Sequence, residues 1–456
     1  MKPDQQTSDL ERQVILLALR SRLAILVLQF IFNLIIPDHQ SDAFVSPFTS
    51  LPKTSLDTGV DWLLGGLLRW DAQYHLHVSI YGYVYENSLA FFPGFAVCIK
   101  LIGSIVEYAL FPLNIVSVHL ISALLFNLVC FTLAAKALYR LSVRKLQDAN
   151  LAFLACTLFC INPASIFFTA PYSESLFSLL TFTAMLAEDG TWKQYFVISL
   201  SAIVRSNGVT NLGFPAYGQL KKHAYMPKSI LNWISFLVQL AVIVVSTMSL
   251  FFLYQMYSYI RFCTNYPYKH SPEVIETALA KSYVLAGQGT SGMCNQTHVI
   301  PYFYIQNHYW NVGFLEYFQL KQIPNFALAF PIIHYVSTEC ISYFKRNTDL
   351  TKSLGLSRVH QNTRMALIYE YIVHLSVLLV ICLFFVHIQV ATRILCSSSP
   401  ALYWLWAMII YSKEKKTVFS LSDVPHMTTV SFTIFSYCLI YCVLGTILFS
   451  NHYPWT

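Results

Sequence analysis

The stretch VILLALRSRLAILVLQFIFNLII, residues 14–36, decides the fold class. A run of about 20 mostly apolar residues is long enough for a helix to cross the hydrocarbon core of a bilayer. The run ends at Pro37 without the small-residue site that marks a cleavable signal peptide. We therefore interpret it as an uncleaved first membrane helix. We expect Arg20 and Arg22 to extend toward its cytosolic end.

The composition extends this interpretation to the whole chain. Of 456 residues, 56% are hydrophobic and only 11% are charged, and the mean hydropathy is +0.53. Soluble domains carry about 25% charged residues, so a water-soluble globule, a disordered chain and a coiled coil are excluded. The sequence predicts an all-α polytopic integral membrane protein with about 10–11 transmembrane helices.

The net charge of +7 comes from short basic clusters between apolar runs. Such clusters mark the cytosolic side of a membrane protein, so we expect a cytosolic N-terminus and no nucleic-acid partner. The clusters are Lys2 with Arg12, Lys136 to Lys145, Lys221 to Lys228, Lys345 to Arg364, and Lys413 to Lys416.

One multispanning domain, residues 1–456, is predicted, with two large segments on the lumenal side. These are a first loop over 37–88 and a long loop over 261–325. An odd number of crossings must separate the first loop from Lys136. We expect residues 113–139 to span and residues 89–110 to form a re-entrant or interfacial element.

A polar cluster interrupts the apolar run over residues 192–218. It reads Arg205-Ser206-Asn207-Gly208, and such a cluster at membrane depth predicts a broken helix pair that faces a cavity. Arg205, with Asn207, is a candidate for binding phosphate, because a guanidinium binds phosphate through two hydrogen bonds. A structural arginine bonded to free carbonyls explains the residue equally well. No internal repeat is present, which disfavours a transporter.

Polar and aromatic residues mix densely in the predicted lumenal segments, as an enzyme acting on sugars requires. Asp71, in Arg69-Trp70-Asp71-Ala72, is a candidate general base that activates a hydroxyl nucleophile. Its alternatives are a helix cap or an ion pair with Arg69. Glu174 stands where a helix is expected to begin, where a carboxylate also favours the helix dipole.

Arg393, like Arg205, is a candidate for binding phosphate. Ser397 and Ser398 follow it closely and have hydroxyls that can donate to phosphate oxygens. A second interpretation, an arginine extended to the membrane interface, is left open here.

Three further patterns concern metals, disulfides and glycosylation. The lumenal histidines, His39, His75, His77 and His308, show no metal-ligand spacing, and we predict no metal site. Cys263 and Cys294 flank a polar segment and form a candidate disulfide. Asn295-Gln296-Thr297 is the only N-glycosylation acceptor pattern in the chain.

Several blocks of sequence resemble the family of second mannosyltransferases of GPI-anchor biosynthesis. They occur in family order from the first helix to the penultimate one, so the resemblance covers most of the chain. The blocks include Ile36-Pro37-Asp38-His39, Arg69-Trp70-Asp71-Ala72, Phe91-Phe92-Pro93-Gly94-Phe95, Asn162-Pro163-Ala164-Ser165 with Tyr172-Ser173-Glu174-Ser175, Arg205-Ser206-Asn207-Gly208, Asn307 to Phe326, and Thr392-Arg393 with Ser397-Ser398-Ser399-Pro400.

The resemblance implies a GT-C glycosyltransferase of the endoplasmic reticulum membrane with a lumenal active site. It implies transfer of a second mannose, in α1,6 linkage, from dolichyl-phosphate mannose to a monomannosylated glucosaminyl-(acyl)phosphatidylinositol. An acidic residue of the first lumenal loop characterises the class, and Asp71 matches it. Such enzymes generally invert and need no metal or other cofactor, and some lineages use a small accessory membrane protein.

Together, the residues and the resemblance give a set of candidate donor- and acceptor-binding side chains around a catalytic Asp71. The set is Arg69, Trp70, Asp38, His39, Glu174, Arg205, Asn207, Gln306, Asn307, His308, Tyr309, Trp310, Asn311, Arg393, Ser397 and Ser398.

Three other functions remain open at this point. One is a dolichyl-phosphate-sugar transferase that serves N-glycan precursors or protein O-mannosylation. The others are a lipid or solute transporter and a non-catalytic scaffold. Product analysis and the effect of removing the Asp71 carboxylate distinguish them.

Overall fold

The computed structural model describes residues 3–41, 43–295, 300–357, 363–416 and 426–455. Within these ranges the regular structure is helical, apart from one isolated bridge between Tyr85 and Leu285. This confirms the predicted all-α class. Of the basic residues that define the predicted topology, Lys2 and Arg358 lie outside the described residues.

Five helices in the described ranges are long and apolar enough to cross a membrane, and a bent pair is a sixth candidate. The five are α1 (Pro3–Ile35), α5 (Ile115–Leu146), α10 (Ile230–Cys263), α15 (Arg364–Phe384) and α18 (Thr429–Ser450). The bent pair is α16 (Ala391–Ser398) with α17 (Pro400–Glu414), which meet at 82°.

This number is lower than the predicted 10–11 because several apolar runs form short helices separated by breaks. A helix of 10–17 residues is shorter than the roughly 20 residues that a crossing requires. The shorter helices are α4 (Pro93–Val106), α6 (Ala149–Cys160), α7 (Glu174–Leu186), α8 (Trp192–Val204) and α9 (Gly213–Ala224). A further long helix, α13 (Ile323–Arg346), contains Pro331.

The structure separates residues 89–110 from residues 113–139 as the sequence predicts. Of the two runs, only the second forms a helix of membrane length, α5. The first forms α4, whose 14 residues pack against α3 (Asp71–Tyr81), α5 and α8. Helix α4 is thus a short element that packs against protein on one face, while Leu101 and Ile105 on another face are exposed.

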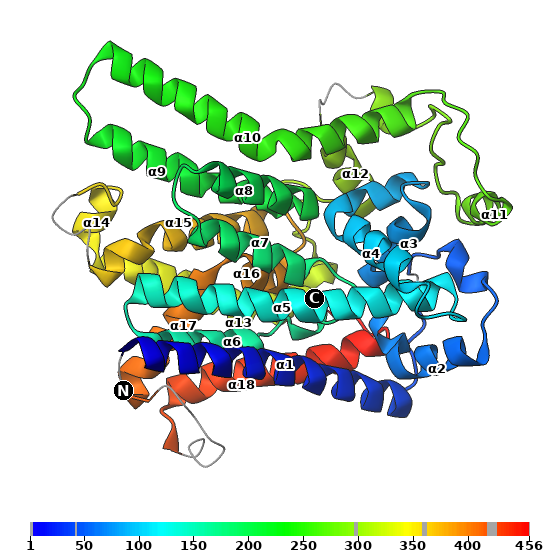
Figure 1. Cartoon of the computed structure of the whole chain (residues 1–456), viewed down its shortest axis with the longest axis horizontal. Coiled ribbons are helices and arrows are strands. Elements are labelled where there is room, and N and C mark those ends of the chain that lie inside the picture. The colour runs from blue at the N-terminus through cyan, green and yellow to red at the C-terminus, as the bar shows by residue number, and fades with distance from the viewer. Residues whose placement is uncertain (1–2, 42, 296–299, 358–362, 417–425, 456) are drawn as a thin grey trace.

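The first loop and the long loop lie together at one end of the molecule (Figure 1). We call this region the loop layer. Its elements are η1 (Pro47–Ser50), α2 (Ser55–Leu64), η2 (Gly65–Leu67), α3, η3 (Glu86–Ala90), α11 (Pro272–Lys281), η6 (Gly292–Asn295), α12 (Pro301–Trp310) and η7 (Leu320–Gln322). Backbone bonds join the two loops: Glu86 donates to Val284 at 3.0 Å, and Ala286 donates to Val84 at 3.0 Å.

The opposite end of the molecule holds the start of α1, the turn from α9 to α10, and α14 (Thr348–Lys352) (Figure 1). Basic side chains form ion pairs there, including Arg140 with Glu11 at 2.8 Å and Lys221 with Glu370 at 3.1 Å. The basic clusters and the loop layer therefore occupy opposite ends of the helices.

Asp57 fixes the loop layer to the membrane helices. One carboxylate oxygen accepts hydrogen bonds from Thr54 at the start of α2, and the other accepts from the Asn114 backbone N–H, at 2.9 Å, at the start of α5. Burial alone raises the pKa of Asp57, but these hydrogen bonds outweigh it and lower the pKa to about 2.

Arg22 does not extend toward the cytosolic end of the first helix, so that prediction is wrong, whereas Arg20 is exposed. The Arg22 side chain is buried, and its guanidinium bonds to Cys160 at the end of α6 and to Ser165 and Thr169 in the following turn. Terminal carbonyls of a helix need partners when no water reaches them. Arg22 supplies them and holds the connection from α6 to α7.

Candidate active site

The predicted break in the run over residues 192–218 is present. Helix α8 ends at Arg205, which is extended with φ −149° and ψ 143°, and η5 (Ser206–Leu212) follows before α9 begins. At Gly208 a Cβ atom would lie 2.5 Å from the Ser201 carbonyl carbon. The broken segment therefore lies directly on the α8 backbone, and the break exposes Arg205 and Asn207 to the space beside α7 and α16.

Asp71 is the first residue of α3, and a strained residue precedes it. Trp70 has φ 53°, a value that costs a bulky side chain about 1–3 kcal/mol. The Asp71 backbone N–H donates to the Tyr172 hydroxyl at 3.0 Å. The reversal at Trp70 and this bond together direct the Asp71 carboxylate toward the membrane helices.

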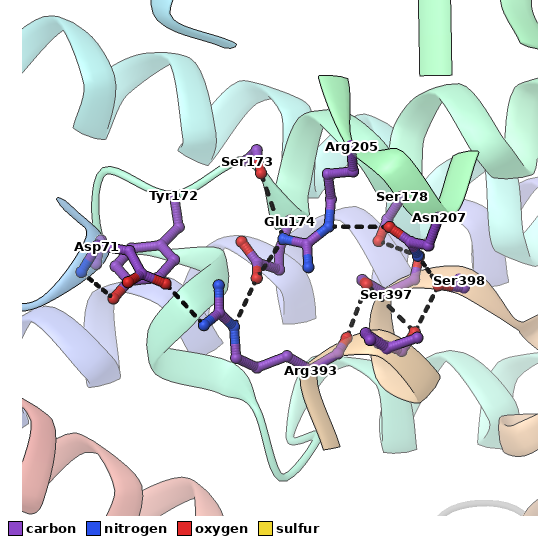
Figure 2. Close-up of polar contacts among 12 residues, drawn as sticks. Asp71, Tyr172, Ser173, Glu174, Ser178, Arg205, Asn207, Arg393, Ser397 and Ser398 are labelled. Atoms are coloured by element: carbon purple, nitrogen blue, oxygen red, sulfur yellow. Dashed lines mark hydrogen bonds and ion pairs between the residues drawn. The ribbon is translucent and has the colours of Figure 1, made fainter. Parts of the chain in front are cut away.

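Four charged side chains form one ion chain, shown in Figure 2. Asp71 Oδ2 pairs with Arg393 Nη1 at 2.9 Å, and Arg393 Nε pairs with Glu174 Oε1 at 2.9 Å. Arg205 Nη1 pairs with the same Glu174 oxygen at 2.5 Å. We call this set the ion chain. Its members come from four segments of sequence. Arg69, which was considered as an alternative ion-pair partner for Asp71, is not among them.

The ion chain is buried at Glu174 and open at Asp71. The Glu174 side chain is 0% exposed, whereas the Asp71 side chain is 32% exposed. Across the described residues, the Nη2 groups of Arg205 and Arg393 and the Asp71 Oδ1 have no hydrogen-bond partner. The ion chain thus has two cationic donor groups and one carboxylate oxygen that remain available to bind a ligand.

Asn207 connects the site to α16. Ser397 and Ser398, which were predicted to donate to phosphate oxygens, make other hydrogen bonds. Asn207 Nδ2 donates to Ser398 Oγ at 2.8 Å. The Ser397 and Ser398 hydroxyls donate to the carbonyls of Arg393 and Ile394, so their protons are already used within α16. The structure therefore gives them no free donor for a phosphate oxygen.

His75 lies one helical turn after Asp71 and is 4% exposed. Its ring packs edge-on to Phe91 and Phe95, and Nδ1 is buried without a hydrogen-bond partner in the described part of the chain. Burial lowers the pKa of His75 to about 3, so the imidazole is neutral near pH 7. This neutral ring adds no third positive charge beside the two guanidinium groups.

Three predicted site residues form a separate cluster. Arg69 Nη2 pairs with Asp38 Oδ2 at 2.7 Å, and Arg69 Nε donates to the Ser450 carbonyl at 3.2 Å. His39 stacks on Tyr453 with ring centres 5.2 Å apart. These contacts join the first loop to the end of α18, so the structure does not bring Asp38, His39 or Arg69 into the ion chain.

Trp70, also predicted to bind sugar, is turned toward the same C-terminal segment. Its ring meets that of His452 edge-on, with centres 5.9 Å apart. Its Nε1 is buried without a hydrogen-bond partner among the described residues. The backbone of Trp70 positions Asp71, while its ring lies against the end of the chain.

The predicted residues of α12 divide into two groups. Trp310 meets Tyr74 and Phe91 edge-on at 6.1 and 6.0 Å, and Tyr74 stacks on Phe91 at 4.2 Å. Since Tyr74 lies on α3, one turn after Asp71, these aromatic rings form a wall near Asp71. Gln306, Asn307 and His308 are not in the ion chain, and the side chains of Asn307 and His308 are exposed.

The Tyr309 hydroxyl donates to Glu86 Oε2 at 2.6 Å. Ser291 donates to the other oxygen of this carboxylate, which is 1% exposed. Glu86 thus joins α12 of the long loop to η3 of the first loop. The sequence analysis missed Glu86 because no motif marks it, and it missed Tyr172, although Tyr172 stands two residues before Glu174.

Cys263 and Cys294 are joined by a disulfide, with Cα atoms 5.4 Å apart, which connects the end of α10 to η6. Asn295 is exposed, while Gln296 and Thr297, the rest of the glycosylation pattern, lie outside the described residues. Use of Asn295 stays a prediction.

The described residues contain no group of three or more His, Cys, Asp or Glu side chains placed to hold a metal ion. The site itself presents a carboxylate, two guanidinium groups and aromatic rings.

Comparison with known proteins places this geometry in context. Residues 11–456 match the family described as Mannosyltransferase (PIG-V). The GPI alpha-1,6-mannosyltransferase 2 of Mus musculus is 35% identical, with 98% of this chain and 99% of that protein covered. The Homo sapiens protein of that name is 35% identical, with 98% of each covered.

Two further proteins are similar to this chain, one in sequence and one in structure. The GPI mannosyltransferase 2 of Drosophila melanogaster is 33% identical over 96% of this chain and 98% of that protein. A solved oligosaccharyltransferase from Archaeoglobus fulgidus, in complex with an inhibitory peptide and a dolichol-phosphate, aligns with a TM-score of 0.41 and 12% identity. That alignment covers 93% of this chain and 56% of the other.

Proposed function

The chain belongs to the PIG-V mannosyltransferase family, and on this premise we propose that Asp71 is the base with which it transfers mannose from dolichyl-phosphate mannose. The enzyme is a glycosyltransferase of GPI biosynthesis in the endoplasmic reticulum membrane, and it adds the second mannose in α1,6 linkage, as the names of its relatives describe. The observation that carries the catalytic proposal is the ion chain, whose only substantially exposed member is Asp71.

The reaction follows from the free atoms of the ion chain. Asp71 Oδ1 takes the proton of the acceptor mannose 6-hydroxyl as that oxygen attacks the anomeric carbon. The new C–O bond forms while the bond from the anomeric carbon to the phosphate oxygen breaks, and dolichyl phosphate leaves. Attack on the face opposite the leaving group inverts a β-linked donor to an α-linked product.

Arg205 and Arg393 supply the electrostatic part of the reaction. Each keeps one free Nη2 group, and the negative charge that develops on the leaving phosphate is stabilised by such prearranged donors. Glu174 holds both guanidinium groups through one oxygen, so their positions do not need to change when the phosphate arrives. We assign Glu174 as a positioning residue and the two arginines as phosphate-binding residues.

A cavity of about 330 Å³ between α9 and α15 fits the lipid part of the donor. It begins at Thr210, whose hydroxyl bonds to the Asn207 carbonyl at 2.7 Å, and continues along Phe214, Val373 and Val377. Its lining is mostly apolar. We assign this cavity to the prenyl chain, whose phosphate end then lies beside Arg205.

We also propose an orientation for the protein in the membrane. The basic clusters at the end opposite the loop layer favour a cytosolic N-terminus and a lumenal site, because cytosolic loops are enriched in lysine and arginine. The acceptor is the monomannosylated glucosaminyl-(acyl)phosphatidylinositol. A requirement for a small accessory membrane protein stays a prediction.

The decisive experiment uses microsomes from cells that lack their own second GPI mannosyltransferase. Labelled dolichyl-phosphate mannose and the one-mannose precursor are added to wild-type and Asp71→Ala chains of matched abundance. We expect the wild type to form the two-mannose lipid and the variant to lose at least about 100-fold in rate. Near-normal transfer by the variant would exclude Asp71 as the base.

A separate control tests the accessory protein and the acceptor. If neither chain transfers mannose, co-expression of small membrane proteins of the host tests for a missing subunit. Transfer to a different lipid or to protein would assign the enzyme to another dolichyl-phosphate-sugar pathway.

A further inference from the structure

A small hollow of about 90 Å³ lies between the end of α12, the connection over residues 311–322, and His387. We call it the amide pocket, because Asn311, Gln319 and Gln322 line it together with Glu316, Tyr317, Lys321 and the ring of Trp310. The pocket is small beside the cavity of about 330 Å³ between α9 and α15, so we expect it to hold part of a sugar rather than a whole head group.

Contacts with residues 384–389 hold the walls of the amide pocket in place. His387 Nε2 bonds to the Trp310 carbonyl at 2.5 Å, and its ring stacks on Tyr317 at 4.4 Å. The Tyr317 hydroxyl donates to Gln389 Oε1 at 3.0 Å. The Leu315 backbone N–H donates to the Phe384 carbonyl at 2.8 Å. The hollow is therefore preformed, as ligand sites usually are.

The chain makes this hollow with residues in left-handed conformations. Asn311 has φ 51° where α12 ends, and Leu315 has φ 59°. Asparagine tolerates this conformation better than most residues, whereas leucine pays a steric cost. The strained turn sets Glu316 at the rim of the pocket.

The Glu316 carboxylate is exposed and forms no ion pair with any described residue, including Lys321, which also lines the pocket. An unpaired carboxylate beside amides and aromatic rings suits a ligand that carries both hydroxyls and one positive charge. The glucosamine of the acceptor is such a ligand, because its amine is the only cation on the carbohydrate chain between the first mannose and the inositol phosphate.

The pocket also lies at a suitable place relative to the base. Trp310 is shared: it lines the amide pocket, and it meets Tyr74 of α3 edge-on at 6.1 Å. Asp71 stands three residues before Tyr74. Trp310 therefore connects the amide pocket to α3, the helix that begins at Asp71, and an acceptor bound at both places would pass along this ring.

We propose that the amide pocket binds the glucosamine of the glycolipid acceptor and that Glu316 recognises its free ammonium group. The proposal rests on the proposed function and adds a specificity to it. Glu316 selects acceptors whose amine is free over those whose amine is acetylated. Lys321, in the same lining, is placed to pair with the inositol phosphate that follows the glucosamine.

The test compares two one-mannose acceptors, one with a free glucosamine amine and one with that amine acetylated. The KM for each acceptor is measured at saturating donor in microsomes that contain wild-type chain, Glu316→Gln or Glu276→Gln. Glu276 is the matched control, since it is an exposed glutamate of α11 in the same loop and does not line the pocket.

We expect the wild type to prefer the free amine. Glu316→Gln should raise the KM for the free-amine acceptor about fivefold, the value of a partly exposed ion pair, while leaving the KM for the acetylated acceptor and for the donor unchanged. Lys321→Gln should raise the KM for both acceptors equally. Glu276→Gln should match the wild type.

Two outcomes overturn the proposal in distinguishable ways. If the wild type transfers mannose but Glu316→Gln keeps its preference for the free amine, the amide pocket does not bind the amine, and the proposed function stands. If the wild type transfers mannose to neither acceptor, even with the host's small membrane proteins supplied, the proposed function fails and the assignment of the pocket fails with it.

Discussion

Two buried arginines, Arg22 and Arg393, show how the same side chain serves different purposes. Arg22 makes five hydrogen bonds, to Ser21, Ser165, Thr169 and the Cys160 carbonyl, which match the five N–H donors of a guanidinium. Arg393 bonds only through Nε and Nη1, to two carboxylates.

The difference lies in what each guanidinium leaves free. Arg22 has no remaining donor and packs 3.9 Å above the Phe131 ring, so it completes the ends of broken helices. Arg393 keeps Nη2 and adjoins Asp71, whose side chain is 32% exposed. Burial and charge alone therefore do not distinguish these two arginines, whereas their unused donors do, and on the proposed function it is these donors that bind phosphate.

The strongest test of this comparison replaces each arginine by methionine. Arg393→Met should lower transfer at least about 100-fold per folded molecule, because it removes a phosphate donor and releases the Asp71 carboxylate. Arg22→Met should lower the amount of folded protein but leave the activity of the surviving fraction within about threefold, since it costs buried carbonyls their partners.

Activity is therefore divided by folded protein, measured by fluorescence-detected size-exclusion chromatography. A loss of specific activity in Arg22→Met as large as that in Arg393→Met would contradict the distinction between the two residues.

A second test removes the charge between the two site arginines. Glu174→Gln keeps the shape of the side chain but leaves Arg205 and Arg393 close together with one carboxylate fewer. Breaking a buried ion pair costs about 3–5 kcal/mol, so we expect a lower melting temperature as well as a rate reduced at least about tenfold. Thermal unfolding in detergent and kcat at saturating donor measure the two effects separately. An unchanged rate in a destabilised variant would reduce Glu174 to a purely structural role.

The smallest expected effect is at Ser397. Its hydroxyl donates to the Arg393 carbonyl at 2.7 Å and accepts nothing in the ion chain, so Ser397→Ala should change the donor KM by less than about twofold. The measurement is donor KM at saturating acceptor. A tenfold rise would restore the interpretation of Ser397 as a phosphate ligand that the sequence first indicated.

Sequence patterns predicted the parts of this molecule that depend on local composition. A polar cluster that contains glycine, in the middle of an apolar run, favours a helix break at membrane depth, so the break at Arg205 was accessible from sequence. The all-α class followed from composition in the same way. The number of membrane-length helices could not be predicted in this way, because the sequence of an apolar run does not show whether a break divides it into shorter helices.

The partners of the charged side chains could not be predicted from the sequence. Arg69 stands two residues from Asp71, yet it pairs with Asp38, while Asp71 pairs with a residue 322 positions away. Glu86 bonds to Tyr309 across 223 positions. The packing of the helices determines which side chains pair. Closeness in sequence therefore does not predict these partners.

The sequence distances within the ion chain have a consequence for how the protein is made. Glu174 and Arg205 are synthesised within about 30 residues of each other, and Arg393 follows roughly 190 residues later, which at ribosomal speed is on the order of 10–40 s. During that interval Asp71 has no guanidinium partner from α16. The ion chain is therefore completed only as translation nears its end.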